Sequence, residues 1–352
     1  MQMRDCIVIG GGQCGLYAAH CLAAQGRDFL LLERSQPGSA WRARLSSMTL
    51  FTSRQFCGLP GKPMAGAPEG FPTVDEMAAY LEQYAAPLAA HIKTDTEVVN
   101  VSHNGDGFVV QTGNGEQLLA RSLINATGSN QQCIVPPMAS ALDAEVVQYT
   151  AAVREFENLP AHGQAVVVGS GASGRQIAAV LAEKGLRVTL ARGTPRGLPP
   201  NTVLGKDLFW WLKRLGILFA DKNSLIAKLL KTRNPVPCGE VNDSGLLHRG
   251  VELQGRAVSC LGREVQFNNG ESVETDLVVW ALGYQDATDW LQIDQTVQDG
   301  EFVQSYGNTP QPGLFVVGRK WLSCRASELV MGTQADVDRV MVTLAGYLDK
   351  RG

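Results

Sequence analysis

The sequence predicts an α/β fold in which a unit of strand, glycine-rich turn, helix and strand occurs twice. Three observations support this prediction. Apolar runs at residues 6–9 and 165–168 each lead straight into a cluster of glycines. A stretch rich in alanine and leucine follows each cluster, and a further apolar run ends each unit. Short apolar strands that alternate with helices are typical of parallel sheets covered on both faces.

In the first unit, residues 10–15 have the spacing G-x-G-x-x-G, and the apolar run 29–32 ends at Glu33. Glycines at this spacing let the backbone approach a pyrophosphate, and the N-terminus of the following helix favours its negative charge. An acid after the second strand accepts hydrogen bonds from ribose hydroxyls. The first unit is therefore expected to bind an adenosine with free ribose hydroxyls, as in FAD or NAD.

The second unit differs at the position that would meet the ribose. Arg192 stands 23 residues after Gly169, and Glu33 stands 23 residues after Gly10. A carboxylate would repel a 2′-phosphate, whereas a guanidinium group would pair with it. The second unit is therefore expected to bind NADPH, with Arg196 in support. The alternative is that Arg192 is a solvated loop cation.

The two halves also match beyond the turns. In each half, two short strands precede an apolar strand that closes with alanine and glycine. These segments are residues 98–101, 108–110 and 122–128 in the first half and 258–261, 264–267 and 277–283 in the second. The closing Ala126 and Ala281 stand 116 and 112 residues after the first glycines of their turns. Such similar spacing predicts two copies of one fold, that is, two Rossmann-like dinucleotide-binding domains.

Composition limits the class of protein. A chain of 352 residues and 37.8 kDa has room for about two domains, and 45% apolar residues suit a globular protein. The formal charge of −3 removes the electrostatic basis for nucleic-acid binding. No apolar run approaches the roughly 18 residues of a membrane span, and the N-terminus has no secretory pattern. A cytoplasmic protein without a transmembrane segment is expected.

The spacing of cysteine and histidine argues against dithiol and metal chemistry. None of the eight cysteines stands in a C-x-x-C pair, and the five histidines are scattered along the chain. We expect eight reduced thiols without a shared role, and no bound metal. Cys14, at the start of the first predicted helix, is expected to be a small packing residue.

Several further segments resemble one family of flavoproteins. The segments are residues 39–42, 54–60, 71–73, 80–85 and 313–318. They are similar to those of the flavin-containing monooxygenases, within the flavoproteins that have two dinucleotide-binding domains. The resemblance covers nearly the whole chain and implies FAD on the first turn and NADPH on the second. It also implies an NADPH domain, residues 159–283, that is inserted into an FAD domain of residues 1–158 and 284–352.

The repeat and the resemblance together predict the residues of two sites. For FAD they are Gly10, Gly12, Gln13, Cys14, Gly15, Glu33, Arg34, Trp41, Arg42, Thr52, Val99, Ala126, Thr127, Gly128 and Gly318. For NADPH they are Gly169, Ser170, Gly171, Ala172, Ser173, Gly174, Arg192, Arg196, Ala281 and Gly283. No catalytic base is assigned. Candidate polar contacts to the flavin or nicotinamide are Thr52, Ser53, Gln55 and Gln148, with surface hydrogen bonding as the alternative for each.

The resemblance implies an NADPH-dependent monooxygenase that passes an oxygen atom from O2 to its substrate through a flavin peroxide. A small, apolar substrate oxidised at nitrogen, sulfur or a carbonyl is expected. Gln148 stands where the family fingerprint has histidine, and Arg319 follows Gly318 where many relatives carry aspartate. Two alternatives stay open: an NADPH-dependent flavoprotein reductase or oxidase, and a flavin-binding scaffold or redox sensor. A homodimer is also left open.

One segment in the second half has an unusual composition. Residues 209–230 carry aromatic and aliphatic side chains at helical spacing, with lysine and arginine between them. A nucleotide-binding unit needs no such insertion. Three interpretations are open: packing between the domains, a wall or lid over an apolar substrate pocket, and a helix that lies on a membrane surface.

Overall fold

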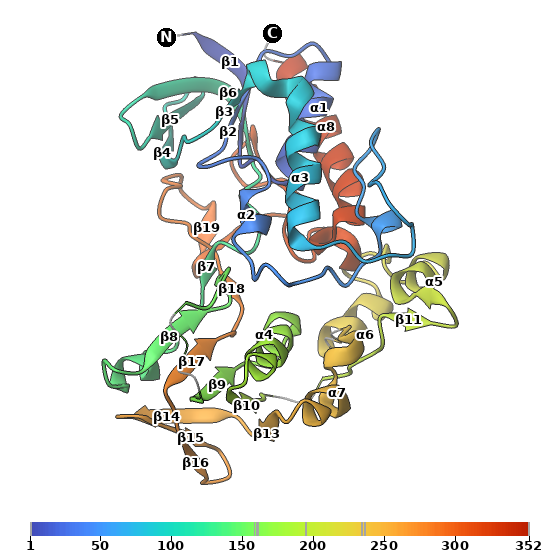
Figure 1. Ribbon diagram of the computed structural model, residues 1–352. Helices are drawn as coiled ribbons and strands as arrows, with labels where there is room; N and C mark the ends of the chain where they lie inside the picture. The colour runs from blue at the N-terminus through green and yellow to red at the C-terminus, as the bar shows by residue number, and fades with distance from the viewer. Residues whose placement is uncertain are drawn as a thin grey trace.

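The computed structural model describes residues 2–157, 159, 162–193, 196–233, 235 and 237–350. These residues form two large sheets, each with its own helices, and Figure 1 shows the two units one above the other. The chain runs from the first unit to the second and then returns, because a strand near the C-terminus joins the first sheet. The predicted α/β class, with one Rossmann-like unit inserted into another, is confirmed.

The first sheet combines parallel strands with an antiparallel meander. In spatial order its strands are β3 (Ile92–Lys93), β2 (Phe29–Leu32), β1 (Met3–Ile9), β6 (Gln117–Asn125), β5 (Phe108–Thr112) and β4 (Val98–His103), with β21 (Leu314–Val316) also paired to β6. The two short strands predicted at 98–101 and 108–110 are β4 and β5, which form a hairpin, and the amide of Asn104 donates to the carbonyl of Gly107 at 3.1 Å.

Both faces of the first sheet are covered, which explains the continuous apolar run in β1. Cys6 and Val8 are buried on the face that packs against the helices. The helices are α1 (Gln13–Ala24), α3 (Val74–Ala85) and α8 (Thr333–Asp349). Ile7 and Ile9 are buried on the opposite face. Because side chains alternate along a strand, both faces need apolar residues.

The second sheet is entirely parallel in the described residues. Its order is β13 (Glu252–Gln254), β10 (Arg187–Ala191), β9 (Gln164–Val168), β17 (Leu277–Trp280) and β8 (Val147–Thr150), with α4 (Ala172–Glu183) packed against β9 and β10. A meander of β14 (Ala257–Leu261), β15 (Glu264–Phe267) and β16 (Ser272–Glu274) corresponds to the one in the first half. Strand β6 belongs to the first sheet and β8 to the second, so the chain passes from one sheet to the other between these two strands, before residue 159. Residue 158, the expected boundary, lies outside the described residues.

A helical insertion lies between β10 and β13. It contains β11 (Thr202–Val203), β12 (Lys206–Asp207), α5 (Leu208–Arg214), α6 (Leu225–Arg233) and α7 (Asp243–His248). Phe209 and Leu218 are buried against Phe56 and Leu329, so the α5 part of segment 209–230 is packing. The remaining short elements are α2 (Ser39–Arg42), β7 (Gln132–Cys133), β18 (Tyr284–Gln285), β19 (Val297–Gln298), β20 (Glu301–Phe302) and the 3-10 turns 54–56, 86–91, 137–141, 239–241, 325–328 and 330–332. Within the described ranges, no helix has the length and apolar character to cross a membrane.

Candidate active-site cleft

A cavity of about 1270 Å³ lies between the two units, and both glycine-rich turns line it. The first turn follows β1 and the second follows β9, so the two turns lie at the carboxyl ends of the parallel strands. This edge of an open α/β sheet is where ligands bind. We call residues 10–15 with Glu33 the first cradle, and residues 169–174 with Arg192 the second cradle.

The glycines of the first cradle have two separate roles. Gly10 has φ +107°, and a Cβ there would lie 2.6 Å from the carbonyl oxygen of Ala126. A Cβ on Gly15 would lie 1.9 Å from the carbonyl oxygen of Gly10. These two glycines are required by the fold itself. By contrast, no described atom lies within 4 Å of a Cβ built on Gly12, which lines the cleft, so the space there suits a ligand.

The second cradle repeats this geometry. Gly169 has φ +113°, and a Cβ there would lie 2.3 Å from the carbonyl oxygen of Ala281. A Cβ on Gly174 would lie 1.9 Å from the carbonyl oxygen of Gly169, and one on Gly171 would meet no described atom within 4 Å. The predicted equivalence of Ala126 and Ala281 is therefore visible as the same close contact.

Glu33 is already held in place by the backbone. Its side chain is buried, and its Oε2 accepts a hydrogen bond from the amide of Gly11 at 2.6 Å. Its Oε1 accepts one from the amide of Ser35 at 2.9 Å. Each carboxylate oxygen can accept a further bond, which suits the hydroxyls of a ribose. The open space at Gly12 and this carboxylate fit the adenosine diphosphate part of FAD.

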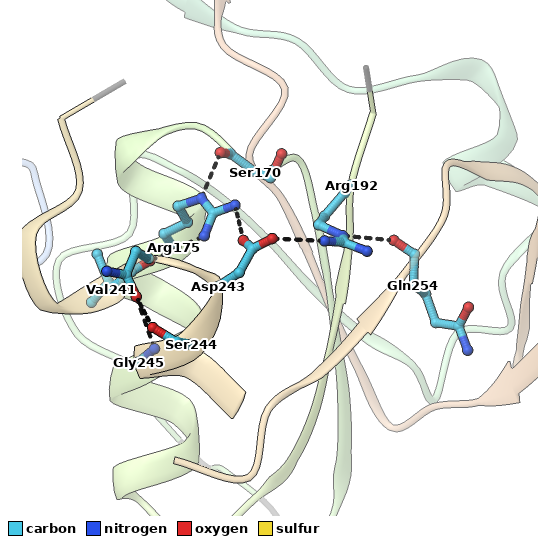
Figure 2. A network of polar contacts seen from close by, with 9 residues as sticks. Ser170, Arg175, Arg192, Val241, Asp243, Ser244, Gly245 and Gln254 are labelled. Atoms are coloured by element: carbon cyan, nitrogen blue, oxygen red, sulfur yellow. Dashed lines mark hydrogen bonds and ion pairs between the residues drawn. The ribbon is translucent and has the colours of Figure 1, made fainter. Parts of the chain in front are cut away.

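Arg192, at the end of the second cradle, forms a partly exposed ion pair. Its Nη1 lies 2.9 Å from Oδ2 of Asp243, and its Nε lies 3.4 Å from the carbonyl oxygen of Gln254 (Figure 2). The other oxygen of Asp243, Oδ1, lies 2.6 Å from Nη2 of the buried Arg175. The side chain of Arg192 is 38% exposed, so the solvated-loop interpretation and the binding of a phosphate both stay predictions.

The cleft is positively charged although the chain as a whole is not. Among the described residues that line it, eight are cationic and three are acidic. The cations are Arg34, Arg44, Arg192, Arg196, Lys231, Arg256, Lys320 and Arg325, and the acids are Glu33, Glu97 and Glu328. Loss of solvation lowers the pKa of Lys320, and the neighbouring guanidinium groups of Arg319 and Arg325 lower it further. Such a cleft suits polyanionic ligands, as dinucleotides are.

Most of the predicted binding residues line this cleft, and six predicted residues do not. Gly15 lies behind the first turn, and the guanidinium of Arg42 pairs with Glu82 at 2.7 Å on the surface. Val99 is 44% exposed, whereas its neighbour Val98 lines the cleft. The other three are the polar candidates Ser53, Gln55 and Gln148.

The polar candidates are held in other contacts. Gln148 lies on β8, where its side chain donates to the carbonyl of Ala139 at 3.2 Å and accepts from the indole of Trp280 at 2.9 Å. Gln55 donates to Oγ of Ser53 at 3.1 Å and to Oε2 of Glu69 at 3.1 Å. Thr52 is the candidate that lines the cleft, with its hydroxyl 3.2 Å from the sulfur of Cys57.

The thiols are not arranged for disulfide exchange. All eight cysteines, each of them among the described residues, are free. Cys14 lines the cleft, but burial raises its pKa to about 12, which keeps the thiol protonated at neutral pH. Its sulfur lies 3.6 Å from the hydroxyl of Thr333. Within the described ranges, no group of His, Cys, Asp and Glu is placed to hold a metal ion.

The chain after Gly318 adds residues that the sequence did not indicate. Lys320, Trp321, Arg325 and the segment 327–330 line the cleft just before α8. Arg319 forms an ion pair with Asp286 and donates to the carbonyl of Gly128. It therefore connects the two segments, after β6 and after β17, in which the chain passes between the units. Leu230 and Lys231 of α6 also line the cleft. The end of the helical insertion therefore forms part of its wall.

Comparisons with known proteins agree with this geometry. The profile of the pyridine nucleotide-disulphide oxidoreductase family matches residues 7–201. The CzcO-like oxidoreductase of Geobacillus kaustophilus is 33% identical over 338 residues, which are 95% of this chain and 96% of that protein. Indole-3-pyruvate monooxygenase YUCCA1 of Oryza sativa is 26% identical over 81% of this chain and 78% of its own length.

Among solved structures, a flavin-containing monooxygenase from Stenotrophomonas maltophilia superposes with a TM-score of 0.78. It is 26% identical and covers 98% of this chain and 99% of its own. The resemblance predicted from the sequence is therefore confirmed. This chain belongs to the pyridine nucleotide-disulphide oxidoreductase family and is an oxidoreductase enzyme, a flavoprotein of the flavin-containing monooxygenase-like kind.

Proposed function

We propose that this enzyme binds FAD in the first cradle and NADPH in the second, and that it inserts one atom of O2 into a small organic substrate at nitrogen, sulfur or a carbonyl. In the balanced reaction, NADPH, a proton, O2 and the substrate give NADP⁺, water and the oxygenated product. The observation that carries the proposal is that both cradles open into one cavity in which, among the described residues, Cys14 is the single cysteine of the wall. A dithiol reductase would need a pair of thiols there.

The residues of the cleft would divide the work between binding and exclusion of water. The amide at the open Gly12 and the N-terminus of α1 would hold the FAD pyrophosphate, and Glu33 would accept from its ribose. When bound, the two cofactors supply hydride transfer and the activation of O2. Apolar side chains of the wall, including Phe51, Leu329 and Val330, would keep water away from the reacting groups.

Apolar walls also suit an apolar substrate. Phe51 lines the cleft and stacks on Phe209 of α5, with ring centroids 5.8 Å apart. The relative from Oryza sativa is named for indole-3-pyruvate, which joins an aromatic ring to a carbonyl group. We therefore include indole-3-pyruvate among the probes, beside simple amines, sulfides and ketones. The free cysteines suit a reducing compartment, so we place the enzyme in the cytoplasm.

The test is the fate of oxygen during turnover. The purified holoprotein is supplied with NADPH in air, and NADPH loss, hydrogen peroxide and oxygenated product are measured with each probe. A monooxygenase gives close to one product per NADPH with its substrate. If every probe yields hydrogen peroxide in step with NADPH and no product, the enzyme is the reductase or oxidase of the alternative. If NADPH does not reduce the bound flavin, the scaffold remains.

A further inference from the structure

We infer that Asp243 sets the coenzyme selectivity of the second cradle, because its carboxylate occupies one side of Arg192 and so weakens the preference for NADPH over NADH. The inference rests on the proposed function, in which this cradle binds a nicotinamide coenzyme. Figure 2 shows Asp243 between the guanidinium groups of Arg175 and Arg192.

Asp243 is fixed by Arg175 rather than by Arg192. The side chain of Arg175 is 3% exposed, so its charge needs a nearby counter-ion, and Oδ1 of Asp243 lies 2.6 Å away. Arg175 also donates to the carbonyl oxygens of Ser170 and Val241, each at 3.1 Å. Asp243 is itself 40% exposed, but removing the counter-ion of a buried charge is destabilising. Asp243 therefore stays in place when a coenzyme binds.

Arg192 gives part of its hydrogen-bonding capacity to protein groups. Its Nη1 is bound to Asp243 at 2.9 Å, and its Nε and its backbone amide both face the carbonyl oxygen of Gln254, at 3.4 and 3.1 Å. A bidentate grip on a phosphate uses two donors of one guanidinium group. These contacts engage one of the two donors on Nη1 and the donor on Nε, so the second donor on Nη1 and both on Nη2 can still meet a phosphate. Arg192 is weakened as a phosphate site because the carboxylate of Asp243 offsets its charge.

The carboxylate acts in opposite ways on the two coenzymes. A 2′-phosphate at Arg192 would lie close to the negative charge of Asp243 and be repelled. A free 2′-hydroxyl could instead donate a hydrogen bond to that carboxylate, as ribose hydroxyls do to an acid.

Arg192 and Asp243 line a side cavity of about 520 Å³, and Arg196 and Arg256 line it as well. These two further arginines would still attract the phosphate. Their two charges outnumber the single carboxylate. The wild-type enzyme is therefore expected to bind both coenzymes, with a preference for NADP⁺ of about tenfold or less, far below that of a cradle with an unopposed arginine.

The test compares NADP⁺ and NAD⁺ by isothermal titration calorimetry on the oxidised holoprotein. In Asp243→Asn, which keeps the shape and an acceptor oxygen, the affinity for NADP⁺ should rise about tenfold (about 1.4 kcal/mol). The affinity for NAD⁺ should stay the same or fall slightly. In an Arg192→Ala background the same substitution should shift the ratio by less than tenfold, because only the direct effect of the carboxylate on the 2′ group remains.

Two further measurements make the result decisive. The double variant Arg175→Gln with Asp243→Asn removes the buried charge together with its counter-ion, so it replaces the single variant if that one fails to fold. A ratio that is unchanged or shifted towards NAD⁺ would overturn the inference, because Asp243 would then only orient Arg192. Absence of binding by both coenzymes to the wild type would overturn the proposed function as well.

Discussion

The two cradles have the same backbone geometry but differ in the groups that hold the residue expected to meet the ribose. In the first, the Glu33 carboxylate is held by the amides of Gly11 and Ser35. In the second, Arg192 is held by another side chain, Asp243, which also serves Arg175. Backbone amides leave the net charge of Glu33 intact, whereas Asp243 offsets that of Arg192. We therefore propose that the first cradle takes one class of ligand and that the second accepts both nicotinamide coenzymes.

The largest loss of stability is expected at the last glycine of each turn, where the two cradles have the same close backbone contact. Gly15→Ala and Gly174→Ala each place a Cβ 1.9 Å from a carbonyl oxygen, so each should cost about 3 kcal/mol of unfolding free energy. Gly15→Ala should lose the flavin absorbance, whereas Gly174→Ala should keep it and lose reduction by NADPH. Urea unfolding and absorbance spectra measure both. A wild-type unfolding midpoint in either variant would contradict the shared geometry.

The middle glycines separate ligand binding from folding. Gly12→Ala and Gly171→Ala add a methyl group where no described atom lies within 4 Å, so the ligand-free stability should change by less than about 1 kcal/mol. Each methyl group would fill the space meant for a pyrophosphate, and affinity should fall about 100-fold, for FAD in the first variant and for NADP⁺ in the second. Calorimetry tests this, with the other cofactor as the control. Equal losses for both ligands in one variant would show that the cradles are not independent.

Glu33→Gln tests the acid of the first cradle. The variant loses a charge-assisted hydrogen bond and turns an amide group towards a backbone donor, which should cost about 2 kcal/mol in the stability of the FAD complex. The measurement is the thermal unfolding temperature with and without added FAD. An unchanged response to FAD would remove Glu33 from the site.

Arg192→Ala is the counterpart in the second cradle. Because Asp243 already offsets this arginine, the affinity for NADP⁺ should fall only about tenfold (about 1.4 kcal/mol), and that for NAD⁺ by less than twofold. Titration of the oxidised holoprotein with each coenzyme gives both numbers. Equal losses for the two coenzymes would remove the phosphate role of Arg192.

The smallest effect concerns a difference between the turns, Cys14 in the first and Ser173 in the second. Burial raises the pKa of Cys14 to about 12, so the thiolate is favoured only above that pH and is scarce at pH 8. Iodoacetamide should label Cys14 of the folded protein very slowly at pH 8, and the rate should still be rising at pH 10. Labelling in urea is the control. A rate that levels off near pH 8 or 9 would contradict the protonated thiol.

Much of the fold could be predicted because its strongest constraints are local. A parallel strand covered on both faces, a turn that needs glycines at fixed positions and an alanine-rich helix lie within about thirty residues in each unit. The equivalence of Ala126 and Ala281 was predicted from the repeat, and the structure adds that the carbonyl of each lies close to the first glycine of its turn. The candidate polar residues were less predictable. Gln148 falls on β8, which pairs with β17 of the second sheet and directs its side chain to Trp280.

The sequence by itself determined the two cradles and the opposite charges at their ends, because each is set by residues within a short stretch of chain. The tertiary structure alone decided what surrounds those charges. Asp243 stands 51 residues after Arg192 and reaches it only because α7 packs beside α4, and Lys320 reaches the cleft only because β21 returns to the first sheet. Such contacts depend on the path of the whole chain, and short-range patterns do not encode them.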